Sequence, residues 1–310
     1  MHGSLRDIRL FVAAYEERSF TAAAQRESAT QSGVSQHIRN LEESFGVRLF
    51  LRDKGRVVPT PAGDSYYRRC IEVLRAHDAA SRAVKSYAAG LEGEIVVGLM
   101  PTMTRCTLAP ALADFVERHP NTAVRVVEGY SASLTQMVRT GELDFAIVPA
   151  FPGAPGLKSR LFLRTPEVLV SRAGSPLEHM APIRLADLGP LRLVLPSKLN
   201  TRRLTLETYC ASNGVEIERV LELDAMLGTL DFVARTDWVA VLPALMMARD
   251  PSHSFTVNPI ANPSLSLDLV LIEPSRRAMT AQAEAFLDML EREAAALNAD
   301  WLPEGAAQLS

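Results

Sequence analysis

Apolar residues in the stretch 20–50 recur with the period of an α-helix. Thr30 precedes the periodic part and suits the N-cap position, because its hydroxyl can accept a hydrogen bond from a free backbone N–H at the helix start. A shorter Ala-rich helix is predicted over residues 22–27, before a tight polar junction at residues 28–30. The stripe of the second helix, at spacings i, i+4, i+7 and i+11, consists of Val34, Ile38, Leu41 and Phe45.

The opposite face of this second helix carries polar side chains without negative charge. Such side chains can reach base edges and phosphates, so the pair of helices is interpreted as a helix-turn-helix whose second helix enters the major groove. Two packed surface helices with a polar outer face are the alternative. His37 is read as a surface or helix-packing residue. The candidate DNA contacts on this face are Gln31, Ser32, Ser35, Gln36 and Arg39.

A further helix precedes this pair and a hairpin follows it. Ser4 and Asp7 form a possible capping box for a helix with apolar positions from residue 5 to 15. Two β-prone runs, 47–50 and 56–58, flank a turn signal at 53–55. Such a wing can place Arg52 and Arg56 against the phosphate backbone, although an ordinary solvated hairpin has the same pattern.

A long helix is predicted from residue 61 to 89. Thr60-Pro61 provides a capping hydroxyl followed by Pro at the first helical position, and Gly90 provides a stop. We expect this linker helix to pair with a second copy of the chain, with a solvated tether as the alternative. The loosely spaced apolar positions of the pairing face are Tyr67, Cys70, Leu74, Val84 and Ala88.

Strands and helices alternate after residue 93, in two similar series. This repeat of architecture predicts two βαβαβ lobes that bind a small ligand between them. Segments 161–171 and 265–272 are expected to cross between the lobes, and the last helix, 281–297, to pack on the body. The strands are expected at 94–100, 123–128 and 143–148, and again at 191–195, 217–222 and 238–242; the helices are expected at 108–118, 134–139, 203–212 and 226–234.

Composition agrees with a two-part, globular chain. Of 310 residues, 47% are hydrophobic, but no window resembles a membrane span or a signal peptide, so we expect a cytoplasmic protein with no membrane partner. The net charge of −3 divides into +3 for residues 1–92 and −6 for the remainder, as expected for a nucleic-acid-binding head on an acidic body. The three cysteines are far apart and read as reduced thiols.

Helix starts in both predicted lobes form the candidate ligand site. Free N–H groups and the helix dipole at such starts favour an anion, and hydroxyl groups can orient it, so a small anion or carboxylate is the expected ligand. A plain helix cap is the alternative for each residue. Arg105 and Arg202 are possible countercharges, with an exposed salt bridge as the simpler interpretation. The candidate effector contacts are Thr102, Met103, Thr104, Ser131, Ser197, Asn200 and Thr201.

Catalysis is the competing class, and the sequence gives it little support. There is no GxSxG elbow, Walker A loop, GxGxxG or HExxH motif, and no nucleophile adjoins an obvious base. Cys106 lies where a helix dipole can acidify a thiol, but burial is the commoner situation. We therefore expect no enzyme, no catalytic residues, no cofactor and no metal site. A soluble small-molecule-binding protein without DNA-binding output is the remaining alternative.

The N-terminal residues resemble the LysR-type transcriptional regulators, and the order and length of the whole chain agree. The resemblance implies an N-terminal winged helix-turn-helix, a linker helix and an α/β two-lobed effector-binding domain similar to type 2 periplasmic binding proteins. It also implies a homodimer or homotetramer that binds double-stranded promoter DNA and responds to a small molecule. The matching residues are Leu10-Phe11-Val12, Ser19-Phe20-Thr21, Ala23-Ala24, Gln31, Val34-Ser35, Ile38-Arg39, Leu41-Glu42, Gly46-Val47, Leu49-Phe50, Arg52, Thr60 and Gly63.

The head departs from the family pattern at a few positions. Glu27 stands where Leu is usual, so its carboxylate is expected either to be buried at a cost or to turn outward. Ser32, Gly33 and Gln36 also differ, and Gly33 is expected to weaken the helix by up to ~1 kcal/mol relative to Ala. The expected division is a DNA-binding domain (1–60), a linker helix (61–92) and an effector-binding domain (93–310), with lobe 1 at 93–164 and 266–310 and lobe 2 at 165–265.

Overall fold

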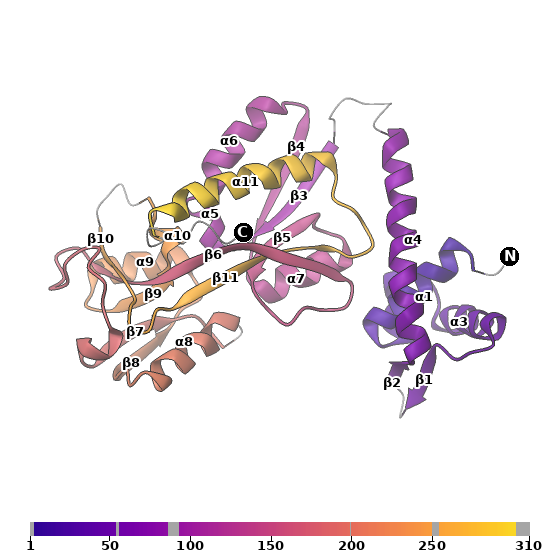
Figure 1. The fold of residues 1–310 in the computed structure, drawn as a ribbon, viewed down its shortest axis with the longest axis horizontal. Helices are drawn as coiled ribbons and strands as arrows, with labels where there is room; N and C mark the ends of the chain where they lie inside the picture. The colour runs from indigo at the N-terminus through magenta and orange to yellow at the C-terminus, as the bar shows by residue number, and fades with distance from the viewer. Residues whose placement is uncertain (1–2, 54–55, 86–92, 199, 250–253, 302–310) are drawn as a thin grey trace. The chain divides into compact units, whose positions relative to one another are not determined.

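A computed structural model describes residues 3–53, 56–85, 93–198, 200–249 and 254–301. By contacts the chain divides into two compact units (Figure 1). Unit 1 comprises Met1–Leu91 together with the short segments Gly153–Lys158 and Glu273–Met279. Unit 2 comprises Glu92–Pro152, Ser159–Ile272 and Thr280–Ser310.

Three helices open unit 1, and each begins at a capped residue. Ser4 and Asp7 form the predicted capping box of α1 (Leu5–Glu17). The Ser19 hydroxyl caps α2 (Phe20–Arg26), which therefore begins two residues before the predicted helix. The Thr30 hydroxyl caps α3 (Gln31–Phe45) as predicted, and Gly46 ends that helix in the left-handed conformation that glycine tolerates, at φ 70°.

A two-stranded hairpin follows α3, as the sequence predicts. Strands β1 (Phe50–Asp53) and β2 (Arg56–Pro59) are antiparallel, with Phe50 opposite Pro59. The first strand begins later than the predicted run at 47–50. The backbone N–H groups of Leu49 and Phe50 donate instead to one carboxylate oxygen of Glu42, at 2.7 and 3.0 Å. Glu42 thus fixes the start of the hairpin to the last turns of α3.

The linker helix α4 (Pro61–Lys85) begins at Thr60, whose hydroxyl accepts from the N–H of Gly63 at 3.0 Å. The predicted end of the helix at residue 89, with Gly90 as stop, lies outside the described residues. Cys70 and Leu74 are buried in the core of unit 1, and Tyr67 stacks on Tyr15 with ring centroids 3.9 Å apart. These positions are therefore covered within one chain, and the expectation that they form a pairing face is wrong for them.

Phe11 lies at the centre of the core of unit 1. Its side chain is completely buried, and its ring centroid lies 5.3 Å from that of Phe50 and 4.8 Å from that of Tyr66. These rings come from α1, β1 and α4, so one aromatic cluster joins the first helix, the hairpin and the linker helix. Such burial typically contributes several kcal/mol.

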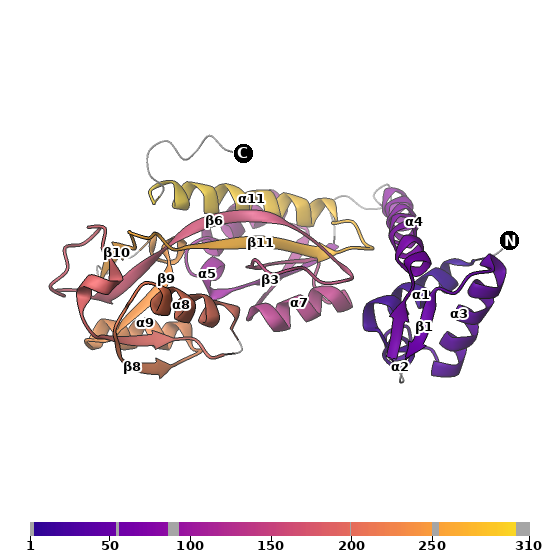
Figure 2. The same cartoon turned by 60° about the horizontal axis from the view of Figure 1, so that its bottom comes forward.

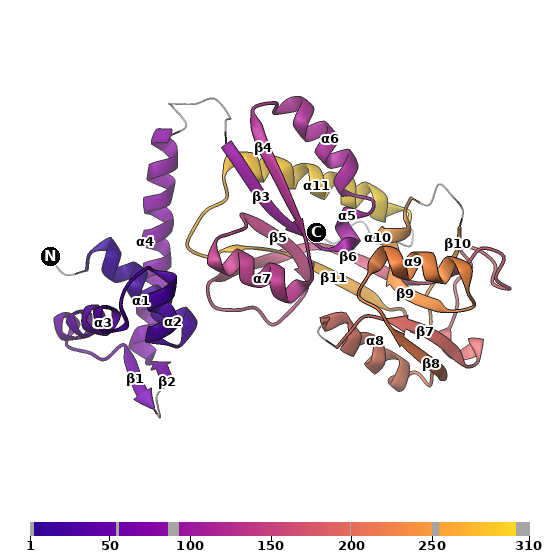
Figure 3. The ribbon, with the colours of Figure 1, turned by 180° about the vertical axis from the view of Figure 1, so that it is seen from behind.

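Unit 2 is built on one mixed sheet with the order β4-β3-β5-β11-β6-β9-β7-β8 in the described residues, with β10 (Phe255–Pro259) beside β6. Each end of the sheet holds three parallel-paired strands and the helices that connect them, so the predicted pair of βαβαβ lobes is confirmed (Figure 3). The first group contains β3 (Gly93–Leu99), α6 (Leu108–Arg118), β4 (Thr122–Glu128), α7 (Ser131–Thr140) and β5 (Phe145–Pro149). The second contains β7 (Leu191–Leu195), α8 (Thr201–Ser212), β8 (Ile217–Glu222), α9 (Met226–Arg235) and β9 (Val239–Pro243).

Two long strands join these groups at the predicted places. Strand β6 (Leu157–Arg172) pairs with β9, and β11 (Ser266–Pro274) pairs with β5, both antiparallel. The last helix, α11 (Ala281–Ala299), is labelled along its length in Figure 2. It packs against α6, where the ring centroids of Phe286 and Phe115 are 5.1 Å apart. Within the described residues, no helix is long and apolar enough to cross a membrane.

Four short elements escape the sequence pattern. They are α5 (Pro101–Thr104), the 3-10 helix η1 (Leu185–Leu188), α10 (Ala244–Met247) and β10. An element of four or five residues does not complete two helical turns or a long alternation, so periodicity carries little signal for it. Helix α5 matters most, because the expected ligand contacts Thr102 and Thr104 lie in it rather than at the start of a longer helix.

Gly63 and Gly228 provide a matched pair of substitutions to alanine. A Cβ on Gly63 would lie 2.3 Å from the backbone oxygen of Leu49, whereas a Cβ on Gly228, inside α9, would meet Ala225 Cβ at an ordinary 3.5 Å. We expect Gly63→Ala to destabilise the protein by about 1–3 kcal/mol through overpacking. Gly228→Ala should stabilise it by about 0.5–1 kcal/mol. Thermal denaturation of the full chain measures both, and an unchanged Tm for Gly63→Ala would contradict the close approach.

Candidate functional site

The polar face of α3 is presented to solvent as predicted for most of its candidate residues. Gln31, Ser32, Gln36 and Arg39 are exposed, and the first acidic residue of the helix is Glu42 in its later turns. The first turn is held by the Thr30 hydroxyl, which accepts from the N–H of Gly33 at 3.1 Å. The exposed start of α3 can therefore approach a polyanion without like-charge repulsion.

Ser35 is the exception on this face. Only 6% of the residue is exposed, so its placement among freely exposed contacts is wrong. Ser35 instead lines a surface cavity of about 540 Å³ together with Arg39, Glu43 and Arg48. Val34, Ile38 and Leu41 are buried as well, so the buried face of α3 is wider than the predicted apolar stripe and includes Ser35 beside Val34.

Other side chains of α3 are held by neighbours. Gln36 Nε2 donates to Asn40 Oδ1 at 2.8 Å along the helix. His37 contacts Asp7 through Nδ1, so it joins α3 to α1, in agreement with the packing role expected for it. Burial opposes ionisation of Asp7, but hydrogen bonds from Ser4 and the contact with His37 outweigh it and hold the pKa of Asp7 below its usual value.

The contacts at the start of α3 explain why a glycine occupies position 33. A Cβ at this position would lie 3.0 Å from Thr30 Oγ1, the atom that caps the helix. The glycine therefore leaves room for a short capping bond, and the lower helix propensity of glycine is partly offset by that bond.

Strands β1 and β2 place the backbones of Arg52 and Arg56 in the hairpin. Arg52 is opposite Val57 and Arg56 is opposite Asp53. The side chains of both arginines lie outside the described residues, so their phosphate contacts stay a prediction.

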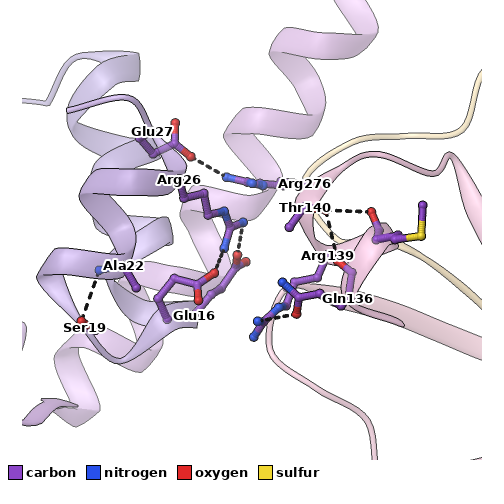
Figure 4. A network of polar contacts seen from close by, with 12 residues as sticks. Glu16, Ser19, Ala22, Arg26, Glu27, Gln136, Arg139, Thr140 and Arg276 are labelled. Atoms are coloured by element: carbon purple, nitrogen blue, oxygen red, sulfur yellow. Dashed lines mark hydrogen bonds and ion pairs between the residues drawn. The ribbon is translucent and has the colours of Figure 1, made fainter. Parts of the chain in front are cut away.

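Ion pairs of Arg26 join helices α1 and α2 (Figure 4). Arg26 contacts Glu16, whose side chain is fully buried, and donates to Glu17 at 2.9 Å. Glu27 is neither buried alone nor turned into solvent, because within unit 1 it accepts from Arg276 at 3.1 Å with 18% of its side chain exposed. The sequence could not show this partner, which lies far along the chain.

In unit 2, the expected ligand contacts gather where parallel strands end. They occupy the segments that follow the carboxyl ends of β3, β4 and β7, and the segment after β8 joins them. The Tyr130 hydroxyl, after β4, donates to the backbone carbonyl of Asp224, after β8. That bond brings the two parallel groups together at their carboxyl ends, the place where open α/β sheets bind ligands.

Thr102 and Ser131 are not helix caps. The N-cap residues of α5 and α7 are Met100 and Tyr130, and neither makes a side-chain capping bond. Thr102 is 3% exposed and Ser131 is 7% exposed, and the hydroxyls of both have no hydrogen-bond partner in the described part of the chain. The alternative of a plain cap therefore fails for these residues, which retain donors for a ligand.

The other two candidates of α5 behave differently. The Thr104 hydroxyl donates to the carboxylate of Glu128 at the end of β4. Met103 is completely buried, so its side chain packs in the interior and is not among the proposed ligand contacts. Sequence reasoning missed Glu128 because its partner is set by the pairing of β4 with β3.

In the second group, Asn200 is a true cap: its side-chain oxygen accepts from the N–H of Arg202 at 3.0 Å. The Ser197 N–H donates to the Asp224 carboxylate at 2.9 Å, and Thr201 is exposed at the first position of α8. Asp224 is thus a second acidic residue at this edge that sequence reasoning missed. Burial, followed by the charges of Asp224 and Glu128, raises the pKa of Tyr130.

Neither suggested countercharge is an exposed salt bridge. Arg105 donates to the backbone carbonyl of Met246 in α10 and contacts Met247 Sδ at 3.1 Å. Arg202 forms a buried ion pair with Glu167, with side chains 7% and 4% exposed. Both guanidinium groups are already engaged within the protein.

The remaining reactive groups are buried. Cys70, Cys106 and Cys210 are free and buried, and burial raises the pKa of Cys70 to about 11 and also raises the pKa of Cys210. Within the described ranges, no group of three or more His, Cys, Asp or Glu side chains could hold a metal ion.

Two family models match the chain. Residues 5–64 match the bacterial regulatory helix-turn-helix protein, lysR family, and residues 88–295 match the LysR substrate binding domain. Among curated relatives, the HTH-type transcriptional regulator CysL of Bacillus subtilis (strain 168) is 25% identical over 285 residues, which cover 92% of this chain and 95% of the relative. The nitrogen assimilation regulatory protein nac of Escherichia coli (strain K12) is 26% identical over 290 residues, covering 93% and 94%.

Solved structures agree on the fold. Full-length BenM matches with a TM-score of 0.57 and 22% identity, over 98% of this chain and 100% of that one. Full-length CbnR complexed with its target DNA matches with a TM-score of 0.53 and 20% identity, over 94% and 100%. A Corynebacterium glutamicum OxyR C206 mutant matches with a TM-score of 0.59 and 23% identity, over 96% of each chain.

Arg39 is the charged residue of the exposed α3 face, and its removal should weaken binding to DNA. If the guanidinium contacts a base, we expect Arg39→Ala to weaken the free energy of DNA binding by ~1–3 kcal/mol. If it contacts a phosphate, we expect the slope of log affinity against log salt concentration to fall by about one. Fluorescence anisotropy on duplex DNA across a salt titration separates these cases. Arg118→Ala, which removes an exposed arginine of α6, is the control. Unchanged affinity at every salt concentration would remove Arg39 from the interface.

Burial of the three cysteines leads to an expectation about oxidation. Because the thiolate is the reactive form, native protein should react with iodoacetamide at least about tenfold more slowly than unfolded protein, and peroxide should leave DNA binding unchanged. Mass spectrometry of the labelled peptides of Cys70, Cys106 and Cys210 measures the reaction. Rapid labelling of any of them in the folded protein would contradict the buried assignment.

Proposed function

The chain belongs to the LysR family of transcriptional regulators, and on that premise we propose how its parts divide the work. The family binds DNA through its helix-turn-helix and carries an effector-binding domain. We assign DNA binding to residues 1–60, the linker to 61–92 and effector binding to 93–310, with lobe 1 at 93–164 and 266–310 and lobe 2 at 165–265. The target is double-stranded promoter DNA, bound by a homo-oligomer, a dimer or tetramer, in the cytoplasm.

The capped helix α3 carries the DNA-binding half of the proposal. Its first turns expose only uncharged or basic polar side chains, and α3 is the second helix of a helix-turn-helix. Gln can pair with adenine through two hydrogen bonds, and Arg can pair with guanine or a phosphate. The proposed contacts are Gln31, Ser32, Gln36 and Arg39, with Ser35 at the edge of the cavity and Arg52 and Arg56 in the wing.

The effector half rests on the uncapped helix starts after β3 and β4. The N-cap residues of α5 and α7 make no side-chain capping bond to the N–H groups that open these helices, and the hydroxyls of two largely buried residues, Thr102 and Ser131, adjoin them. Such groups favour a small anion or carboxylate. Thr104, Ser197, Asn200 and Thr201 complete the proposed contacts from both parallel groups.

Footprinting tests the DNA-binding proposal directly. The full chain should protect a segment of the DNA upstream of its own gene, and bind it at least about 10³-fold more tightly than an unrelated fragment at roughly 150 mM salt. Equal affinity for both fragments would reject sequence-specific binding to this region.

Thr102→Val tests the effector site, because it removes one hydroxyl at nearly constant volume. Isothermal titration with benzoate, succinate, citrate and pyruvate identifies which carboxylate the full chain binds. For that carboxylate we expect Thr102→Val to weaken binding by about tenfold, the loss of one well-placed hydrogen bond. Thr140→Val, at the exposed end of α7, is the matched control. Equal affinity of wild type and Thr102→Val would place the ligand elsewhere.

A further inference from the structure

A buried ion pair lies beside the proposed effector region, where β6 passes between the two parallel groups. Glu167 is 3% exposed, and its backbone N–H donates to the carbonyl of Leu265 at 2.8 Å. The same residue pairs with Pro243 of β9 in the sheet. Its backbone is therefore fixed, and its carboxylate is a buried anchor in the strand that joins the groups.

Arg202, the second residue of α8, meets that anchor in a forked geometry. Nη2 donates to both carboxylate oxygens of Glu167, at 2.7 and 2.8 Å, and Nε donates to Oε1 at 3.1 Å. Nη2 also lies 3.3 Å from the carbonyl oxygen of Val241 in β9. A planar guanidinium bound in this way has little rotational freedom.

The backbone of Arg202 is engaged at the same time. Its N–H donates to Asn200 Oδ1 at 3.0 Å, so that oxygen is directed into the helix. One residue thus ties the start of α8 to β6 and β9 through its side chain, and orients the Asn200 side chain through its main chain.

Stability alone does not require such a pair. Desolvation of two charges cancels much of their attraction, and well-packed apolar residues of similar size often stabilise a protein as well or better. What apolar side chains do not reproduce is a fixed direction and distance, which a forked charge pair provides.

We propose that Glu167 and Arg202 are positioning residues that fix the start of α8 so that Asn200 and Thr201 face the effector. This role rests on the proposed effector site. It assigns no ligand contact to Arg202, whose Nε and Nη2 donors are directed to Glu167 and Val241 and whose charge is paired with that of Glu167. The effector is then held by uncharged donors of α8, and its affinity depends on how firmly that helix start is anchored.

The double variant Glu167→Met/Arg202→Met tests the proposal, because it replaces the pair by apolar side chains of similar length. We expect the full chain to keep its Tm within about 5 °C. Hydrogen exchange in the peptide covering residues 201–206 should nevertheless become at least about tenfold faster. The start of α9, residues 226–231, is the control peptide and should be unchanged.

The second readout is the affinity for a carboxylate. The carboxylate used is the one of benzoate, succinate, citrate and pyruvate that the wild type binds. We expect about tenfold weaker binding by the double variant. Arg202→Lys, which keeps the charge but loses the fork, should lie between wild type and Arg202→Met in both readouts. If the Tm of the double variant is more than about 10 °C below that of the wild type, its loss of stability obscures both readouts. Exchange and carboxylate affinity of Arg202→Lys and Arg202→Met are then compared to test the positioning role.

Unchanged exchange at the start of α8, with Tm retained, would overturn the positioning role. Faster exchange with unchanged carboxylate affinity would overturn it too, since the anchored segment would then not serve the ligand. If none of the four carboxylates binds the wild type, the proposed ligand class fails. The exchange measurement then still decides whether the pair holds the helix start.

Discussion

Every α-helix begins with backbone N–H groups that find no acceptor inside the helix. In this chain the helices that build the framework satisfy them with a hydroxyl from their own N-cap, at Ser4, Ser19, Thr30 and Thr280 for α1, α2, α3 and α11. The starts of α5, α6, α7, α9 and η1 have no such capping bond. Three of these helices, α5, α7 and α9, directly follow the carboxyl ends of parallel strands, and their N–H groups provide a physical basis for the proposed anion recognition there.

The same constraint explains why α3 suits its task. Thr30 and Gly33 complete the cap internally, so the first turn of this helix is stable before any DNA is present. The cap leaves the side chains of Gln31 and Ser32 exposed for other partners. At the other end of α3, Glu42 accepts the backbone N–H groups that open the hairpin. A helix held at both ends presents its side chains in a fixed register, which base recognition requires.

Much of this arrangement could be read from the sequence, because local chemistry determines it. The Ser4 capping box and the Thr30 cap depend only on neighbouring residues, and the sequence predicts both. The two series of strands followed from apolar runs. Partners distant in sequence could not be predicted: the Arg202 carboxylate partner lies 35 residues away, and the packing of Cys70 on the N-terminal core needs the tertiary fold. The proposed ligand contacts follow from their positions after strands, whereas the sequence pattern assigns no role to exposed carboxylates such as Glu128 and Asp224.

Those two carboxylates limit how the proposed site can recognise an anion. The Thr104 hydroxyl donates to Glu128 and the Ser197 N–H donates to Asp224, so each negative charge is partly satisfied by the protein itself. The Arg202 guanidinium is paired with Glu167, whereas the Arg105 guanidinium donates to neutral acceptors, the backbone carbonyl of Met246 and Met247 Sδ, which do not cancel its charge. A highly charged anion would meet repulsion from Glu128 and Asp224, because unit charges a few ångströms apart interact by several kcal/mol in a partly desolvated site. The neutral donors at the helix starts, N–H groups and hydroxyls, suit a ligand with a single, well-defined negative group. On the proposed assignment, the precision of those donors depends on the anchoring of the helices that carry them, and the buried ion pair of Glu167 and Arg202 anchors one of these helices, α8.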